Sequence, residues 1–177
     1  MRAEKRIACL TALVALGFVG PAATQPESAA PRESVIAVAR QVMASARFCT
    51  FVTIGGDGHP QARVVDPLDP DPNLNVYVAT NPRSRKVEEL RKDTRVTLLY
   101  FDAARSAYVT LIGRAVLVTG VEKAAHHKKD WQRFFALDKP DTYTLYRVVP
   151  SRLEVVSARD GLSGDPATWR PAIVDLK

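Results

Sequence analysis

Residues 48–66 read FCTFVTIGGDGHPQARVVD and contain the clearest fold signal in the chain. Apolar and β-branched residues occupy both halves of this stretch, and the turn sequence GGDG at 55–58 separates them. This arrangement predicts an antiparallel β-hairpin. No helix is expected after the glycines, so GGDG is not a dinucleotide-binding fingerprint. In the second strand, side-chain alternation places Arg63 on the same face as Gln61 and Val65, and a cation in the middle of a strand often has a partner.

The rest of the chain continues this strand-rich pattern. Further apolar segments predict strands at residues 74–80, 95–102, 106–119 and 143–157, the last interrupted at Pro150. Helices are expected at residues 34–46, 81–92 and 121–137. Because short turns join most of the strands, we expect an α+β protein in which about six antiparallel strands form a sheet or small barrel with helices outside it.

The amino terminus has the pattern of a secretory signal peptide. Basic residues within positions 2–6 precede a 14-residue apolar run at 7–20, and small residues follow. The run is shorter than the roughly 20 apolar residues that a membrane-spanning helix needs. We therefore expect residues 1–24 to direct export to the periplasm or the exterior, with an uncleaved membrane anchor as the alternative. The expected units after it are a linker at 25–33, a folded domain at 34–157 and an irregular tail at 158–177.

The composition excludes several classes of protein and site. The chain has 177 residues, 46% of them hydrophobic and 25% charged, as in an ordinary soluble domain. Two cysteines, Cys9 and Cys49, are too few for a disulfide-rich scaffold or a cysteine-based zinc site. His126, His127 and Asp130 offer too few ligands for a metal and are interpreted as a solvated helix face. A pI near 9.5 is compatible with nucleic-acid binding. However, an exported protein rarely meets nucleic acid, so we expect none.

The segment ATNPRSRK at 79–86 places cations where a helix disfavours them. Asn81 is a suitable N-cap and Pro82 a favoured first helical residue. The first turn then holds three cations: Arg83, Arg85 and Lys86. Each costs from a few tenths to about 1 kcal/mol beside the positive end of the helix dipole, and Glu88 and Glu89 come too late to cancel all of this cost. A bound anion, best a phosphate, resolves the conflict. A basic face that points into water is the alternative.

Three motifs then occur in order: the hairpin GGDGHPQARVV, the strand end ATNPRSRK and the strand YVTLIGRA. Over residues 35–157 this order resembles the FMN-binding split-barrel family that includes pyridoxamine 5′-phosphate oxidase. The resemblance implies a six-stranded antiparallel split β-barrel with flanking helices. It also implies a homodimer that holds FMN in the groove between its subunits.

The resemblance further assigns residues to the cofactor. Arg63 matches the family arginine that contacts the FMN phosphate, and Val64 and Val65 follow it where backbone lies along the flavin ring. Four residues match the pattern that holds the phosphate: Thr80, Ser84, Arg85 and Lys86. Tyr108 stands where the oxidase proper carries a glutamine, and it is the candidate residue near the ring. No side chain stands out as a catalytic acid or base.

The carboxy-terminal part departs from the oxidase proper. That enzyme has a tryptophan-containing strand and an Arg-Leu-His-Asp-Arg run that read the pyridoxal substrate and the flavin, whereas this chain has LEVVSARDGLSGDP at 153–166. We therefore expect not that activity but an FMN-binding oxidoreductase of the general-stress type, acting on an unassigned small molecule. The alternative is a non-catalytic flavin- or haem-binding protein, and deazaflavin and haem are the alternative cofactors.

Four aromatic residues lie in the carboxy-terminal third of the chain, in the expected helix and in the tail. Trp131, Phe134 and Phe135 fall within the expected helix 121–137 and are interpreted as packing residues. Trp169 lies in the tail. It is expected to pin the carboxy terminus to the barrel, with the capping of a flavin as the alternative.

Overall fold

The computed structural model describes residues 30–176, so the expected signal segment and most of the expected linker lie outside the described residues. No helix within residues 30–176 is long and apolar enough to cross a membrane. The helices are α1 (Arg32–Ala46), α2 (Arg85–Lys92) and α3 (Gly120–Ala125), with short 3₁₀ turns at Lys129–Arg133, Pro140–Thr142 and Ala158–Asp160. The strands are β1 (Cys49–Ile54), β2 (Pro60–Val65), β3 (Val76–Thr80), β4 (Arg95–Asp102), β5 (Ala107–Val118), β6 (Thr144–Val156) and β7 (Ala172–Asp175).

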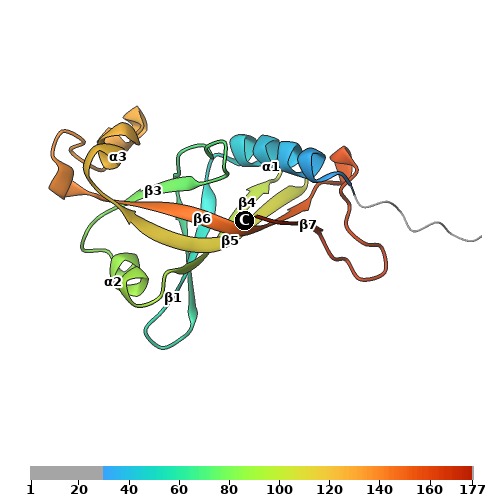
Figure 1. Ribbon diagram of the computed structural model, residues 1–177, viewed down its shortest axis with the longest axis horizontal. Coiled ribbons are helices and arrows are strands. Elements are labelled where there is room, and N and C mark those ends of the chain that lie inside the picture. The colour runs from blue at the N-terminus through green and yellow to red at the C-terminus, as the bar shows by residue number, and fades with distance from the viewer. Residues whose placement is uncertain (1–29, 177) are drawn as a thin grey trace, which may run out of the picture.

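The described strands form one antiparallel sheet in the order β2-β1-β4-β5-β6-β3, with β7 paired to β6. The two ends of this path, β2 and β3, do not pair with each other among the described residues, so the sheet curves without closing. This is the expected α+β split barrel. Figure 1 shows α2 and α3 towards one end of the sheet, and α1 beside β7 towards the other.

Alternating burial defines an inner and an outer face of the sheet. Side chains that alternate along β1, β4 and β5 point inwards, and Phe51, Leu98 and Leu111 are fully buried. Helix α1 packs on β4 and β5 with one apolar stripe, made of Val35, Ala39, Val42 and Met43. Full burial of a valine, leucine, phenylalanine or methionine side chain contributes roughly 1.5–3 kcal/mol, so the inner face holds the barrel together.

The expected interruption at Pro150 is a bulge and not a break, because β6 continues through it. Gly113 pairs with Pro150 and Ile112 pairs with Arg152, which leaves one extra residue on β6 directly after Pro150. A Cβ at Gly113 would lie 2.2 Å from the Val149 carbonyl oxygen. Only glycine therefore allows this close approach of the two strands.

The expected helix at 121–137 is also wrong. Helix α3 ends at Ala125, and a separate 3₁₀ turn begins at Lys129. Side chains of this turn are held by the end of β2: Lys128 bonds the Asp66 carboxylate, and the Trp131 indole donates to the Asp66 carbonyl at 2.9 Å. These tertiary contacts outweigh the local tendency to continue the helix.

The tail is more ordered than expected, because residues 172–175 form β7 against β6 as a seventh strand. Trp169 does not pin the tail to the barrel. Its side chain is 86% exposed, on a turn with φ of 59°. The turn is instead closed by Asp165, whose carboxylate accepts three hydrogen bonds from residues 167 and 168.

Candidate functional site

The site begins at the turn between β3 and α2. Asn81 and Pro82 were expected to begin the helix, but they lie before it. The Asn81 side chain accepts a hydrogen bond from the Arg83 N–H at 2.8 Å, which forms a local turn. Helix α2 therefore starts at Arg85, with Ser84 as its N-cap residue. Arg85 and Lys86 are the first two helical residues, so the conflict between cations and the helix dipole remains.

The end of β3 and the start of α2 bring three polar side chains together. Lys86 Nζ donates to Thr80 Oγ1 at 2.8 Å, and Thr80 Oγ1 lies 3.1 Å from Ser84 Oγ. Ser84 directs its hydroxyl to Thr80 and does not cap the described helix with it. Burial lowers the pKa of Lys86, and the nearby charges of Arg63 and Arg85 lower it further. Lys86 therefore carries a charge that its surroundings do not fully compensate.

A buried carboxylate lies below this group. Glu89 Oε2 accepts hydrogen bonds from Thr53 at 2.5 Å and from Arg63 Nη2 at 2.9 Å. Arg63 Nη1 also donates to Thr53. Glu89 Oε1 lies 3.0 Å from Arg85 Nε, but no hydrogen bond to this oxygen is formed within residues 30–176. Glu89 thus offsets Arg85 among the first-turn cations, together with Arg63 of β2, but it forms no ion pair with Lys86, so the cationic charge of the first turn is cancelled only in part.

The ionisation of Glu89 follows from these contacts. Burial alone would raise its pKa, but the Thr53 hydrogen bond and the charges of Arg63 and Arg85 outweigh it, so the pKa lies below its ordinary value. Glu89 is therefore ionised at neutral pH. Arg85 reaches a second partner, Gln61 Oε1, at 2.9 Å, and its side chain stays 68% exposed.

A cavity of about 660 Å³ opens beside Thr80 and Lys86. It lies where the sheet fails to close, between the ends of β2 and β3, and Val64 and Val65 form part of its lining. Its volume is in the usual range for a site that binds a small organic ligand. Aromatic side chains complete the lining: Phe48, Trp131, Phe134 and Phe135. The cavity thus combines an apolar, aromatic wall with a cationic end.

The aromatic wall comes from the segment that was expected to be one helix. Trp131 is buried, as expected for a packing residue, but Phe134 is 71% exposed over the cavity. The break after α3 turns Phe134 away from the core. The sequence analysis interpreted Phe134 as a packing residue and did not predict that it lines a cavity. Two adjacent phenylalanines, which do not both face the core, were the one indication in the sequence.

The expected cofactor residues fall into three groups. Val64, Val65, Thr80 and Lys86 line the cavity, and Ser84 contacts Thr80. Two arginines lie at the buried carboxylate of Glu89: Arg63 and Arg85.

Tyr108 lies elsewhere. It is opposite Phe101 and Val156, ten residues along β5 from the end of that strand that lies near β3. Ten residues of strand span roughly 30 Å, so one chain does not bring Tyr108 to Lys86.

A family model described as pyridoxamine 5′-phosphate oxidase matches residues 36–158, well over half of the chain. The chain belongs to this pyridoxamine 5′-phosphate oxidase-like family. The match covers both sides of the cavity and the start of α2. No protein with a curated description matches the chain.

Several solved structures share the fold of this chain. A Clostridium acetobutylicum protein related to general stress protein 26 is 17% identical, with a TM-score of 0.67 over 82% of this chain and 96% of its own. A Nostoc punctiforme pyridoxamine 5′-phosphate oxidase-related, FMN-binding protein is 13% identical, with a TM-score of 0.58 over 85% and 98%. A Mycobacterium smegmatis haem-binding protein is 20% identical, with a TM-score of 0.59 over 86% and 59%.

Proposed function

We propose that the protein binds FMN in the cavity between β2 and β3 and acts as an oxidoreductase on a small molecule. The observation that carries the proposal is the cavity itself, whose cationic end is formed at Thr80 and Lys86 and whose wall is aromatic. FMN has the matching parts, a phosphate and a planar aromatic ring. The Nostoc relative, described as FMN-binding, supports this choice.

The residues present fit the phosphate. Lys86 is a half-buried cation with a lowered pKa, and Thr80 and Ser84 offer hydroxyls beside it. Arg85 is exposed enough to turn towards a ligand. A phosphate at this point would relieve the repulsion between cations and helix dipole. In this proposal Val64 and Val65 lie along the flavin ring, and the chain's own part is to bind and orient the ring and to keep water away.

When bound, FMN supplies the redox chemistry by accepting or donating hydride equivalents. The residues of this chain hold the ring, and Phe134 and Phe135 exclude solvent from one side of it. This arrangement needs no catalytic acid or base from the cavity lining.

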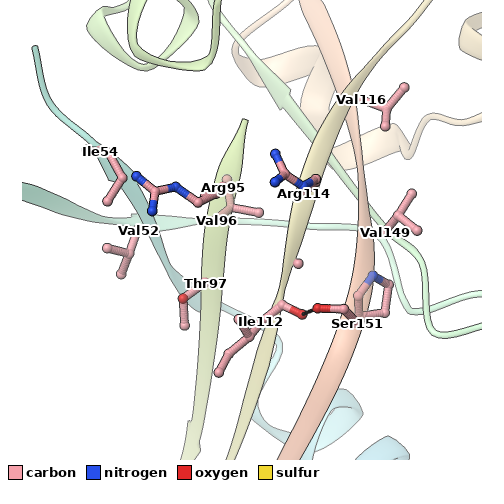
Figure 2. Close-up of a pocket in the computed structure, with 12 residues that line it drawn as sticks. Val52, Ile54, Arg95, Val96, Thr97, Ile112, Arg114, Val116, Val149 and Ser151 are labelled. Carbon is pink, nitrogen blue, oxygen red and sulfur yellow. Dashed lines mark hydrogen bonds between the residues drawn. The ribbon is translucent and has the colours of Figure 1, made fainter. Parts of the chain in front are cut away.

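We further propose a homodimer that covers the outer face of the sheet. A groove of about 610 Å³ on this face is lined largely by apolar side chains of β1, β4, β5 and β6 (Figure 2). Further exposed apolar residues lie on strands of the same sheet, namely Val64, Leu99 and Phe101, and the groove residues Val116 and Val149 are exposed as well. Such a continuous apolar surface is typical of an interface. Val64 also lines the cavity, so a second copy on this face would complete the cavity wall and offer its Tyr108 to the ring.

Haem binding without turnover is the alternative, because the Mycobacterium smegmatis relative is described as haem-binding. Haem iron in proteins is usually held by His, Cys, Met or Tyr. None of these types occurs among the described residues that line the cavity. This favours the flavin.

The cofactor is tested by refolding the protein with FMN and measuring flavin fluorescence. We expect quenching that saturates at about one flavin per chain, and a flavin absorption spectrum after removal of free cofactor. A haem spectrum in protein purified from cells would support the alternative. Oxidation of a reduced nicotinamide, or reduction of a dye, by the loaded protein separates an enzyme from a binding protein.

We also propose that residues 1–24 direct export, so that FMN is loaded outside the cytoplasm. The mass of the protein recovered from the periplasm or the medium tests this. A mature chain that begins at Gln25 supports cleavage. A full-length chain in the membrane fraction supports the anchor instead.

A further inference from the structure

Asp66 lies where two walls of the cavity meet. It directly follows β2, whose last two residues form one wall, and it belongs to the lining itself. Two of its groups are used at once. Its carboxylate accepts a hydrogen bond from Lys128 Nζ, and its backbone carbonyl accepts one from the Trp131 indole at 2.9 Å. Both donors belong to the segment 128–135, which carries most of the aromatic wall.

The ion pair with Lys128 is sheltered from solvent. The side chains of Asp66 and Lys128 are 17% and 24% exposed, and the ammonium group also donates to the Pro67 carbonyl at 2.8 Å. Another ion pair of this segment, between Arg47 and Asp130, has side chains that are 54% and 49% exposed. Exposed ion pairs contribute little to stability. Within residues 30–176, Asp66 is therefore the main polar attachment of the aromatic segment to the barrel.

The aromatic segment reaches both sides of the opening in the sheet. Trp131 packs in a small buried cluster with Tyr77 of β3 and Leu145 of β6. Its indole N–H and the neighbouring Lys128 are tied to Asp66 at the end of β2. Among the described strands, β2 and β3 are the two ends of the sheet that do not pair with each other. The segment therefore bridges them, and Asp66 is its attachment on the β2 side.

The position of the exposed phenylalanine depends on this attachment. Phe134 is 71% exposed, so packing holds it only weakly. Its backbone N–H and that of Phe135 both donate to the Trp131 carbonyl, at 2.9 and 3.0 Å. The Trp131 indole in turn donates to Asp66. A displacement of Trp131 relative to β2 would therefore move the aromatic wall with it.

We propose that Asp66 is a positioning residue: through Lys128 and Trp131 it sets the distance between the end of β2 and the aromatic wall, and so the width of the slot that a flavin ring enters. This inference rests on the proposed function. A planar ring between two walls gains dispersion contacts on both faces. A gap of about 0.5–1 Å on one side forfeits roughly a quarter to a half of the attraction there. The cationic end should be unaffected, because the hydrogen bond between Lys86 and Thr80 does not involve Asp66.

The test removes the ion pair without changing the net charge, in the double variant Asp66→Asn with Lys128→Met. Asparagine keeps the shape of the aspartate, and methionine keeps much of the length of the lysine but cannot donate. The probes are FMN and riboflavin, titrated by flavin fluorescence at fixed salt. We expect both flavins to bind roughly 2- to 10-fold more weakly, the usual range for an aromatic contact. The ratio of their two dissociation constants should stay within about 1.5-fold of the wild-type ratio, because the phosphate contacts are kept.

The matched control is Arg152→Met with Asp175→Asn, which removes an exposed ion pair between β6 and β7 by the same kinds of substitution. Both of its flavin affinities should stay within about 1.5-fold of the wild type, since its contacts lie outside the cavity lining. Wild-type affinity of the Asp66–Lys128 double variant for both flavins would overturn the inference. A loss confined to FMN would overturn it as well, because the pair would then act on the phosphate and not on the ring.

Phe134→Ala distinguishes positioning from a general loss of packing. In the wild-type background it should weaken riboflavin binding roughly 2- to 10-fold. In the double variant, where the phenylalanine is already displaced, it should weaken riboflavin binding less than about 1.5-fold, as expected for two residues that act through one contact. Equal factors in the two backgrounds would show that Asp66 and Phe134 act independently, which contradicts the proposed role.

Trp131→Phe is the second variant if the double variant does not fold. It keeps an aromatic ring in the cluster and removes the indole N–H that bonds Asp66. Both flavins should again bind more weakly, and wild-type affinities would overturn the inference. If the wild-type protein binds neither flavin, the proposed function fails and the positioning role fails with it. If it binds both flavins and these variants bind them equally well, only the positioning role fails.

Discussion

Replacing Lys86 with Gln distinguishes two explanations of the cations at the start of α2: a site that binds an anion, or a basic face that points into water. The ammonium group donates to Thr80 at 2.8 Å and has a pKa lowered by burial and by the charges of Arg63 and Arg85. In the ligand-free protein, keeping this lysine charged therefore costs free energy. A bound phosphate would offset this cost. Glutamine at this position does not incur it, because its side chain is uncharged.

The structure gives opposite expectations for ligand affinity and stability. A hydrogen bond to a charged group contributes about 1.5–3 kcal/mol, so Lys86→Gln should weaken FMN binding roughly 10- to 100-fold. The stability of the ligand-free protein should stay level or rise by a few tenths of a kcal/mol, because an unfavourable charge is gone from the first turn of α2. Glu89 would not be left unpaired, since its ion pairs are with Arg63 and Arg85.

The assay combines fluorescence titration of FMN with chemical unfolding of the ligand-free protein. Lys92→Gln is the matched control, because it removes the same charge from the exposed last turn of the same helix. Its FMN affinity should change less than about twofold. Unchanged FMN affinity in Lys86→Gln together with a loss of stability above about 1 kcal/mol would refute the reasoning, since both results follow from a lysine that serves the fold alone.

Four further outcomes are expected. Phe101→Glu on the outer face should convert a dimer to a monomer in sedimentation experiments, whereas Val121→Glu on α3, which is 89% exposed, should not. Phe134→Ala should leave the free energy of unfolding within about 0.5 kcal/mol but weaken FMN binding roughly 2- to 10-fold in titrations, the usual range for an aromatic contact. FMN affinity, titrated across pH, should fall as the pH rises through the lowered pKa of Lys86, below 10.5, and Lys86→Gln should lack this dependence. The depressed pKa of Glu89 contributes stability above its ordinary value of 4.5 that is lost as the pH falls through the folded-state pKa, so acid unfolding should be shallower in Glu89→Gln.

The strands could be predicted from the sequence because their side chains alternate clearly. The hairpin at 48–66 and the strand at 95–102 were placed to within one or two residues, since most inward positions of β1 and β4 are apolar and the GGDG turn marks where β2 begins. The strand β7 was missed because only Val174 of its four residues is buried. A strand so short carries almost no alternation to recognise.

Elements held by distant contacts could not be predicted locally. The segment 121–137 has helical composition, but its course is decided by Asp66, which holds Lys128 and Trp131 from the end of β2. The start of α2 was misplaced for a similar reason, because the Asn81 side chain closes a turn instead of capping the helix.

For the site, the family resemblance placed Thr80, Ser84 and Lys86 at one phosphate, and the structure has these three side chains in contact. The ion pairs of Glu89 with the nearby arginines were not predicted. Glu89 was considered only along the helix, where it follows Arg85 by four residues, a spacing that permits an ion pair. Its larger effect comes from packing α2 against β1 and β2, which places it between Thr53 and Arg63. Such a contact depends on tertiary structure, and no local pattern encodes it.

The most direct test of the account is to titrate the same protein with FMN and with riboflavin, which differ only in the phosphate. The flavin ring can use the aromatic wall at Phe134 in both cases, but only FMN can use the cationic end at Lys86 and Thr80. The account predicts that FMN binds at least about tenfold more tightly, and that added salt reduces this difference. Equal dissociation constants for the two flavins would contradict it.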